Sequence, residues 1–385
     1  MLFEGERAVE ENLPLFFVIG VMHQWRLAAL FVISGMGTAF AFSRRSWQTY
    51  LKERCVRLLV PLLFVTYILF WGVFTPVDTT ARLLSIFPGI EAMPYGHLWF
   101  IYNLFIYSVI LTPLFVHARD NPDGKLVGSV RALLGMRYGL GLLLLPPLLL
   151  ALNGILLKPW AFGEVGMWWE FPRYLLYFAF GYLMITAREE YFPAIDRIRI
   201  PVTIATPVLS LLFFVAGDAL GVPLLMEGGW VAKGYPAFST GATIGTILQA
   251  YHAWFWCLLI FAWGSKLLNR PSCTLTYLNQ AVYPTYVVHL HVTFIAIGVI
   301  VRLGFGYYVG LALGTVVVVA LCLTIFEIVK RAKLARALFG IKPLPGSVSE
   351  AGPGGWRILA SIVFHLLSFI IIIALMVAIL AAFEG

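Results

Sequence analysis

The stretch from Tyr308 to Val329 reads YVGLALGTVVVVALCLTIFEIV and contains a single charged residue, Glu327, close to its end. An α-helix needs about 20 apolar residues to cross the hydrocarbon core of a bilayer, so this stretch is long enough to span it. A helix also satisfies its own backbone hydrogen bonds where no water is available. The stretch therefore predicts a transmembrane helix.

Nine further apolar stretches of similar length are flanked by charge, proline or glycine. They are Trp25–Phe42, Val56–Phe74, Leu98–Val116, Tyr138–Leu157, Phe171–Ala187, Val202–Gly217, Ser239–Trp263, Ala281–Val301 and Ile358–Ala382. Hydrophobic residues make up 61% of the chain and charged residues 12%, about half the charged share of a soluble domain. The sequence predicts an all-α, polytopic integral membrane protein of about ten transmembrane helices.

Lys and Arg residues gather in alternate loops, at residues 44–57, 119–137, 188–199, 266–270 and 330–357. Loops of this kind stay on the cytoplasmic side of a membrane. Membrane topology thus explains the net charge of +8 without a nucleic-acid partner. We expect a multi-pass protein of a bacterial-type inner membrane. Residues 344–356 would form a flexible cytoplasmic linker, and residues 357–385 an additional C-terminal transmembrane helix.

An even number of spans places both termini outside the cell. The N-terminal tail, with Glu4, Glu6, Glu10 and Glu11, would then have to cross the membrane without a cleavable signal peptide. Either this short acidic tail is translocated, or a further helix that belongs before Met1 is missing.

Histidines dominate the ionisable residues at membrane depth: His252, His289, His291 and His365 lie within predicted spans. Histidine suits proton transfer, because its ordinary pKa of about 6.5 lets it accept a proton from a hydroxyl at neutral pH. The alternative for each is a neutral histidine bonded to a neighbouring helix. His289 and His291 are two residues apart and face different directions on a helix, so they predict no metal site. We expect no bound cofactor.

Arg54 and Arg57 stand at the cytoplasmic entrance of a predicted span, followed by Pro61. Arginines three residues apart share one face of an α-helix. Such a pair can bind phosphates, as in coenzyme A, through charge-assisted hydrogen bonds. The alternative is an ordinary cytoplasmic anchor.

Two further clusters lie at the predicted outer edge. His23 and Arg26 precede the first span, and His97 and Trp99 stand at the start of the third. Residues of these types also occur as interfacial anchors. Together they would form a polar outer vestibule.

Several stretches, in order, resemble the acyltransferase-3 family of membrane-bound acyltransferases, of the glucan or polysaccharide O-acyltransferase type. They are WRLAALFVISG at residues 25–35, ERCVRLLVP at 53–61, HLWFI at 97–101, PRYLLYFAFGY at 172–182, YPTYVVH at 283–289 and LFGIKP at 338–343. Ala28 stands where the family usually has proline. The resemblance covers about Leu13 to Pro343, within a membrane domain of residues 1–343.

The resemblance implies transfer of an acetyl, succinyl or similar group from cytoplasmic acyl-CoA to a hydroxyl of a carbohydrate or glycan-type acceptor. In this interpretation Arg54 and Arg57 bind acyl-CoA as a co-substrate, and His289 handles the proton of the accepting hydroxyl. Tyr286 would orient His289 or stabilise the oxyanion, and His23 and Arg26 would hold the acceptor. His97, Trp99, Arg173 and His365 are further candidates.

The chain departs from the family at its start, because the family's first helix, which carries a histidine usually taken as catalytic, has no counterpart before Leu13. Under one hypothesis the C-terminal helix takes that position, with Arg357 and His365 replacing the missing residues. Two other functions stay open: a catalytically silent, truncated relative, or a multi-pass permease for a glycan or small solute. The sequence does not decide the oligomeric state.

Overall fold

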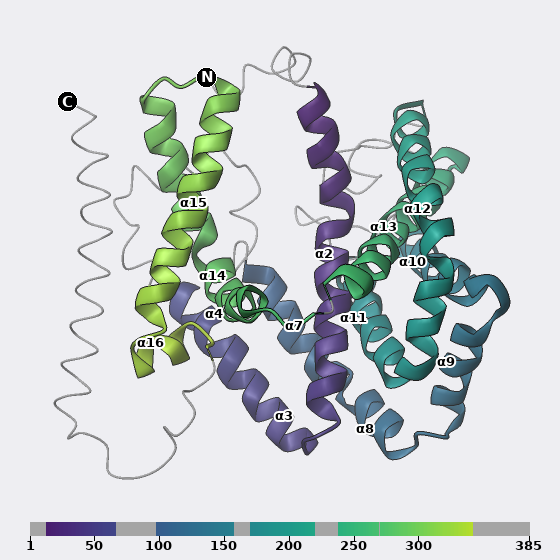
Figure 1. Ribbon diagram of the computed structural model, residues 1–385. Helices are drawn as coiled ribbons and strands as arrows, with labels where there is room; N and C mark the ends of the chain where they lie inside the picture. Colours follow the sequence, from purple (N-terminus) through teal and green to yellow (C-terminus); the bar gives the residue numbers. More distant parts are fainter. Residues whose placement is uncertain (1–12, 67–97, 158–169, 220–237, 269, 342–385) are drawn as a thin grey trace, which may run out of the picture. The chain divides into compact units, whose positions relative to one another are not determined.

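The computed structural model describes residues 13–66, 98–157, 170–219, 238–268 and 270–341, and these residues form helices and connecting turns without a strand (Figure 1). The helices are α2 (Leu13–Phe42), α3 (Trp47–Arg54), a π-helical turn (Cys55–Leu59), α4 (Val60–Phe64), α7 (Trp99–Ile110), α8 (Thr112–Asp120), α9 (Lys125–Gly135), a 3-10 turn (Arg137–Gly139), α10 (Leu140–Leu157), α11 (Glu170–Thr186), α12 (Arg188–Ala219), α13 (Thr240–Leu267), α14 (Cys273–Arg302), α15 (Tyr307–Val329) and α16 (Lys333–Leu338). The predicted all-α membrane fold is confirmed.

Six of the described helices are long and apolar enough to cross a membrane. A seventh span results if α7 and α8, which meet at a bend of 49°, are counted as one. The expected number of ten is therefore not established. The predicted span 358–382, the linker 344–356, His97 and His365 lie outside the described residues, as does the second half of the predicted span 56–74.

Two predicted boundaries were wrong. Helix α2 begins at Leu13 rather than near Trp25, because the preceding residues are also apolar. Helix α12 begins at Arg188, so the basic segment 188–199 is helical rather than a loop, and the helix continues through Pro193, Pro201 and Pro207. Membrane helices tolerate such prolines when neighbouring groups satisfy the carbonyls that prolines leave free.

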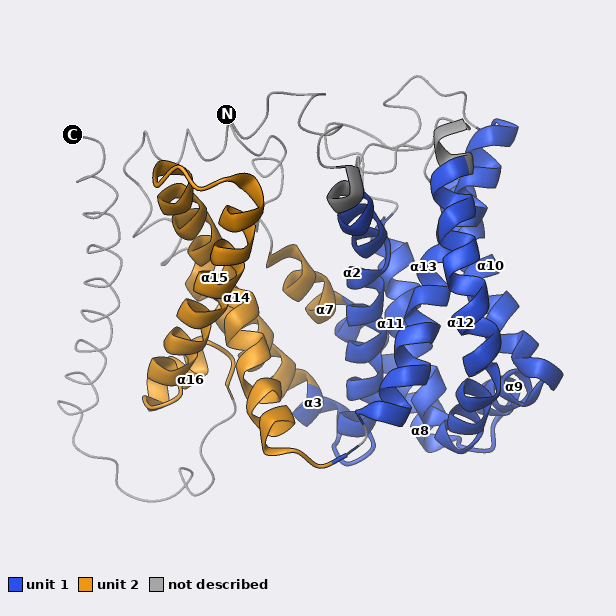
Figure 2. Ribbon diagram, turned by 45° about the horizontal axis from the view of Figure 1, so that its top comes forward, with its two compact units in different colours: residues 1–50, 107–270 blue, residues 51–106, 271–385 orange. Residues whose placement is uncertain are grey.

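The chain divides into two compact units (Figure 2). Unit 1 comprises residues 1–50 and 107–270, and unit 2 comprises residues 51–106 and 271–385. In unit 1, α2 packs on α11, and α13 packs against α2, α10 and α12. In unit 2, α14 and α15 lie side by side, and α16 packs on α4.

The contact between α2 and α11 is a backbone-to-backbone crossing. A Cβ atom built on Gly35 would lie 2.0 Å from the carbonyl oxygen of Phe178, and one built on Gly181 would lie 2.0 Å from that of Val32. Only glycine permits this approach. Phe31 stacks on Tyr174 beside the crossing, with ring centroids 4.7 Å apart.

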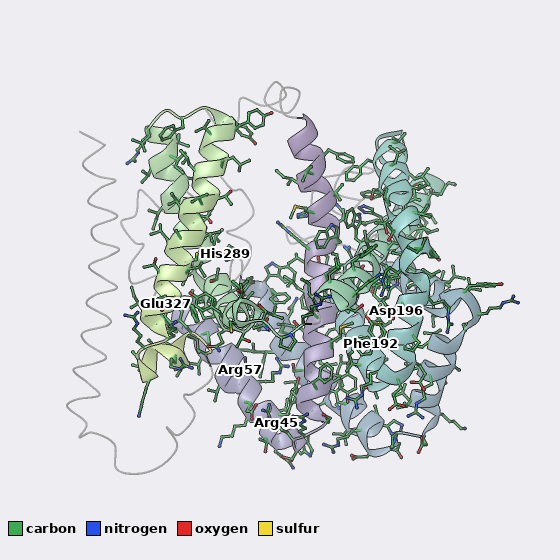
Figure 3. The ribbon with its side chains drawn as sticks, viewed as in Figure 1. Arg45, Arg57, Phe192, Asp196, His289 and Glu327 are labelled. Carbon is green, nitrogen blue, oxygen red and sulfur yellow. The ribbon has the colours of Figure 1, made fainter. Side chains whose placement is uncertain are left out.

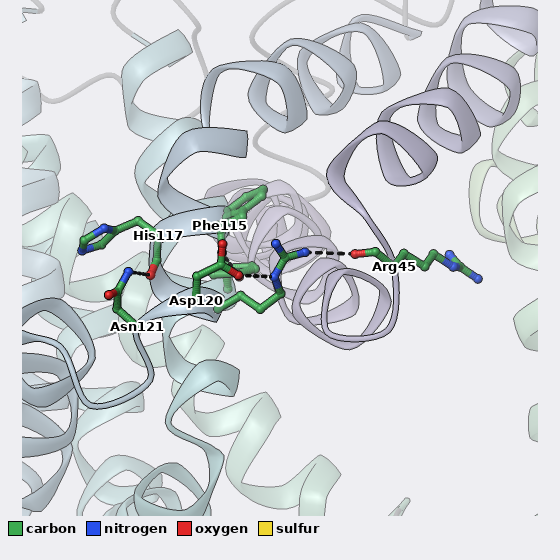
Figure 4. Close-up of polar contacts among 7 residues, drawn as sticks. Arg45, Phe115, His117, Asp120 and Asn121 are labelled. Carbon is green, nitrogen blue, oxygen red and sulfur yellow. Dashed lines mark hydrogen bonds and ion pairs between the residues drawn. The ribbon is translucent and has the colours of Figure 1, made fainter.

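Polar contacts of Arg119 fix the end of α2 (Figure 4). Arg119 of α8 donates a hydrogen bond of 3.1 Å to the carbonyl of Arg45, and its Nε lies 2.8 Å from Asp120 Oδ1. Its guanidinium carbon also lies 5.0 Å from the centre of the Phe42 ring. A cation is favourable where a helix ends and its carbonyls lack donors. Arg119 therefore stabilises the turn between α2 and α3.

Candidate functional site

The expected site residues fall into both units. Unit 2 contains Arg54, Arg57, Trp99, Tyr286 and His289, and unit 1 contains His23, Arg26 and Arg173. Figure 3 labels Arg57 and His289 of unit 2.

His289 lies on α14, a helix whose start is capped by the Ser272 hydroxyl, which accepts a hydrogen bond from the amide of Leu275. The His289 Nδ1 atom is 2.6 Å from the backbone carbonyl oxygen of Tyr286. A carbonyl oxygen can only accept a hydrogen bond, so Nδ1 carries the proton in this contact. In the neutral ring Nε2 is then the basic nitrogen. The half-buried imidazole is held in the tautomer that a general base requires.

Aromatic rings surround this histidine. The Tyr286 ring lies 5.5 Å from the His289 ring and meets the Phe100 ring edge-on at 5.6 Å. Phe100 follows Trp99 at the start of α7. Two separate stretches of the predicted site, at residues 97–101 and 283–289, are therefore in contact within unit 2. The expected proximity of Tyr286 to His289 is present, and the Tyr286 carbonyl orients the imidazole.

Arg54 ends α3, and Arg57 lies in the π-helical turn Cys55–Leu59. The sequence predicted an α-helix here, with both arginines on one face. A π-helix closes its hydrogen bonds over five residues instead of four, which changes the angle between residues three apart. Arg57 is exposed and Arg54 is half-buried. Both are close enough to the Tyr283 hydroxyl to interact with it electrostatically.

Tyr283 connects the arginine turn to the histidine helix. Its hydroxyl donates a hydrogen bond of 2.9 Å to the carbonyl of Arg57. Tyr283 precedes His289 on α14 by six residues, a rise of about 9 Å along the helix axis. Tyr283 thus links the turn that contains the expected donor-binding arginines to the helix that carries the expected catalytic histidine.

In unit 1, His23 and Arg26 lie one turn apart on α2, with Arg26 Nη2 3.3 Å from His23 Nδ1. The candidate membrane span of α2 starts at Phe17. The pair therefore lies within this apolar helix, about 9 to 14 Å along its axis from Phe17, rather than before it as predicted.

The neighbouring face of α2 joins α13. Gln24 is buried and its Oε1 accepts a hydrogen bond of 2.8 Å from Gln249 Nε2. Trp25 stacks on Trp256 with ring centroids 5.7 Å apart. These contacts fix the rotation of α2, and so the direction in which His23 and Arg26 point.

Arg173 is buried and forms an ion pair with Glu170, at 3.3 Å, near the start of α11. Its guanidinium carbon lies 5.5 Å from the centre of the Tyr174 ring. Tyr107 donates a hydrogen bond of 2.6 Å to the carbonyl of Phe171 beside it. A buried, paired arginine of this kind fixes the packing of α11 in unit 1, and this geometry favours a structural role for Arg173.

His252 is fully buried in unit 1. Its Nε2 accepts a hydrogen bond of 3.1 Å from the indole of Trp256, and its ring stacks on Phe213 at 5.0 Å. This is the packing of a neutral histidine between helices. Across the described residues, no three His, Cys, Asp or Glu side chains gather as metal ligands would.

The acyltransferase domain family matches residues 3–327 of the chain. The chain belongs to the acyltransferase-3 family. The expected enzyme class, an acyltransferase, is confirmed by this membership, and the described helices make it a multi-pass membrane protein.

Curated relatives of this acyltransferase include glucans biosynthesis protein C of Escherichia coli K12, of Escherichia coli O157:H7 and of Escherichia coli O81 (strain ED1a). Each is 22% identical over 362 residues, which cover 90% of this chain and 89% of the relative. No solved structure matches the chain significantly.

The sequence did not single out two residues that contact the arginine turn. Tyr283 was quoted only as part of the stretch 283–289, and Gly340 only as part of the stretch 338–343. Both approach the carbonyl of Arg57. The sequence feature that indicates such a contact is Pro61, because a proline leaves the carbonyl four residues earlier without its helical donor. Which residue meets that carbonyl follows only from the fold.

Proposed function

We propose that this acyltransferase transfers an acetyl-type or succinyl-type group from cytoplasmic acyl-CoA to a hydroxyl of a glucan or related glycan. The relatives are glucans biosynthesis proteins by name, and this supports the acceptor class. The protein resides in a bacterial-type inner membrane with its Lys- and Arg-rich loops on the cytoplasmic side, as their alternation supports.

The observation that carries the proposal is the contact between His289 Nδ1 and the Tyr286 carbonyl. With the proton on Nδ1, Nε2 accepts the proton of the acceptor hydroxyl as its oxygen attacks the thioester carbon. The carbon–sulfur bond of acyl-CoA then breaks, and the imidazolium returns a proton to the departing thiolate. The products are the acyl ester of the glycan and free CoA.

Arg54 and Arg57 bind the phosphates of the donor. Guanidinium groups form bidentate, charge-assisted hydrogen bonds to phosphate oxygens. The long pantetheine arm of CoA bridges the axial rise of about 9 Å between Tyr283, which holds the arginine turn, and His289. On α2, His23 and Arg26 bind the acceptor through hydrogen bonds to its hydroxyl groups.

The test compares the full-length chain with His289→Ala in isolated membranes. Radiolabelled acetyl-CoA and succinyl-CoA are supplied with total envelope glycans, and label in the glycan fraction is measured. We expect labelling by the wild type and a loss of about 100-fold or more in the variant, the usual contribution of a general base. His291→Ala, on a different face of α14, is the matched control and should keep most activity.

Full activity in His289→Ala would show that this residue is not the base. No label with either protein, despite correct membrane insertion and a suitable acceptor pool, would favour a catalytically silent relative. Movement of glycan without any acyl-CoA would favour the permease.

A further inference from the structure

The carbonyl of Arg57 has an unusual environment in unit 2. Pro61 follows it by four residues and has no N–H, so the α-helical donor to this carbonyl is missing. Tyr283, 226 residues further along the chain, donates its hydroxyl proton to the same oxygen at 2.9 Å. A carbonyl at the membrane entrance is costly to leave without a donor, so this hydrogen bond stabilises the turn.

Unit 1 contains the same arrangement at residues that are not candidate site residues. Pro146 deprives the carbonyl of Leu142 of its helical donor, and the indole Nε1 of the buried Trp254 donates to that oxygen at 2.7 Å. In both cases an aromatic donor from a neighbouring helix replaces the missing amide. The difference is that the carbonyl in unit 2 belongs to one of the two candidate donor-binding arginines.

Gly340 packs against the same hydrogen bond. It has a φ of +65° and ends α16, where the amide of Ile341 donates to the Arg336 carbonyl at 2.7 Å and that of Gly340 to the Ala337 carbonyl at 3.1 Å. This is a Schellman ending, which favours glycine at the position of positive φ. A Cβ atom here would lie 2.3 Å from Tyr283 Cε1 and 2.8 Å from the Arg57 oxygen.

Aromatic packing holds Gly340 in this position. The Phe339 ring meets the Phe64 ring of α4 edge-on, with centroids 5.6 Å apart. Phe64 follows Pro61 by less than one turn. The end of α16 therefore packs beside the turn that contains Arg57, and Tyr283 of α14 contacts the same turn.

We propose that Tyr283 is a positioning residue for the acyl donor. By holding the carbonyl of Arg57, its hydroxyl fixes the π-helical turn Cys55–Leu59 and so the direction in which Arg54 and Arg57 present their guanidinium groups. The inference rests on the proposed donor-binding function of these arginines.

The experiment measures initial rates of acyl transfer by the purified full-length chain in lipid nanodiscs at varied acyl-CoA concentration. Tyr283→Phe removes only the hydroxyl. We expect the KM for acyl-CoA to rise about three- to tenfold, the effect of one hydrogen bond, while kcat changes less than about twofold. Tyr277→Phe is the matched control, because it removes a hydroxyl on the same helix that donates to Glu327 at 2.9 Å. It should leave this KM unchanged.

A double-mutant cycle separates positioning from general stabilisation. Pro61→Ala supplies a helical N–H for the Arg57 carbonyl, so the hydroxyl of Tyr283 is no longer needed as its donor. We expect Pro61→Ala to raise the KM for acyl-CoA by relaxing the turn, and Tyr283→Phe to add little to that change. Fully additive effects of the two substitutions would overturn the proposal.

The arginine variant tells the two proposals apart. If Arg54→Ala with Arg57→Ala leaves the KM for acyl-CoA unchanged, the arginines do not bind the donor, and the inference fails together with that part of the proposed function. If the arginine variant raises this KM and Tyr283→Phe does not, the arginines bind the donor but Tyr283 does not position them. A raised KM in both supports both proposals.

Discussion

At the scale of single residues, the main result is the state of His289. A histidine in an apolar helix is consistent with either catalysis or neutral packing, and His289 and His252 differ in their burial and contacts. His252 is fully buried and accepts a hydrogen bond from Trp256 through Nε2. His289 is only half-buried and directs its Nδ1 to the Tyr286 carbonyl, which leaves Nε2 as its basic nitrogen. The proposed base is therefore His289, and the expected role of His252 is packing.

The first prediction at this scale concerns the arginine pair. Replacing Arg54 and Arg57 together with alanine should raise the KM for acyl-CoA about tenfold or more, since each charge-assisted contact to a phosphate contributes about 1.5 to 3 kcal/mol. The value of kcat at saturating donor should change much less. Initial rates at varied acyl-CoA concentration measure both constants.

The control for the arginine pair is Lys52→Ala, an exposed cation on the same helix α3. It removes a positive charge without changing the turn at Arg57. An equal rise in KM for Lys52→Ala would mean that the segment acts through its overall charge, as an anchor would.

At the scale of helices, close packing depends on a few positions. Gly35 and Gly181 let α2 and α11 touch through their backbones. Helix α2 also carries His23 and Arg26, the residues expected to hold the acceptor. Their crossing therefore fixes the height and rotation of that pair within unit 1.

Gly35→Ala tests the crossing. Its Cβ atom would lie 2.0 Å from the Phe178 oxygen, so the two helices would have to separate. Overpacking of this kind costs about 1 to 3 kcal/mol or more, and we expect a lower Tm in detergent and a smaller folded yield. Fluorescence-detected size-exclusion chromatography after heating measures both.

The matched variant for the crossing is Gly37→Ala, on the same helix, where an added Cβ would meet nothing within 4 Å. Alanine also favours a helix over glycine by about 1 kcal/mol, so this variant should be at least as stable as the wild type. Equal losses of Tm and folded yield in Gly35→Ala and Gly37→Ala would contradict the close contact between α2 and α11 at Gly35.

At the scale of the whole molecule, the distribution of charge supports the proposed orientation in the membrane. The segment before α14 belongs to the Lys- and Arg-rich side, and α14 begins at Cys273. The Cys273 side chain is exposed, whereas Cys257 and Cys322 are buried and Cys55 is half-buried. The native Cys273 can therefore serve as a chemical probe of the orientation, and no cysteine has to be added.

We predict that a membrane-impermeant maleimide labels Cys273 in inside-out vesicles and not in right-side-out spheroplasts. Charged loops of this composition remain in the cytoplasm. Mass spectrometry of the modified peptide provides the measurement, with Cys273→Ser as the control for labelling elsewhere. Labelling of Cys273 from the outer face would show that the true topology is the inverse of the proposed one.

The sequence alone determined the class of this protein. Long apolar stretches with few charges have one stable solution in a bilayer, the spanning helix, so the all-α membrane fold could be predicted from composition and length. The order of short stretches such as residues 53–61 and 283–289 also indicated the family. The boundaries of α2 and α12 were less predictable, because apolar or amphipathic residues can extend a helix beyond the membrane core.

Only the tertiary structure decided which residues meet. A proline shows in the sequence that a carbonyl lacks its helical donor, but the partner can come from any helix that packs nearby. For Arg57 that partner is Tyr283, and for Leu142 it is Trp254. The proton position on His289 likewise depends on a carbonyl that the fold presents to its ring. Spanning helices follow from local composition, whereas a site follows from long-range contacts between helices.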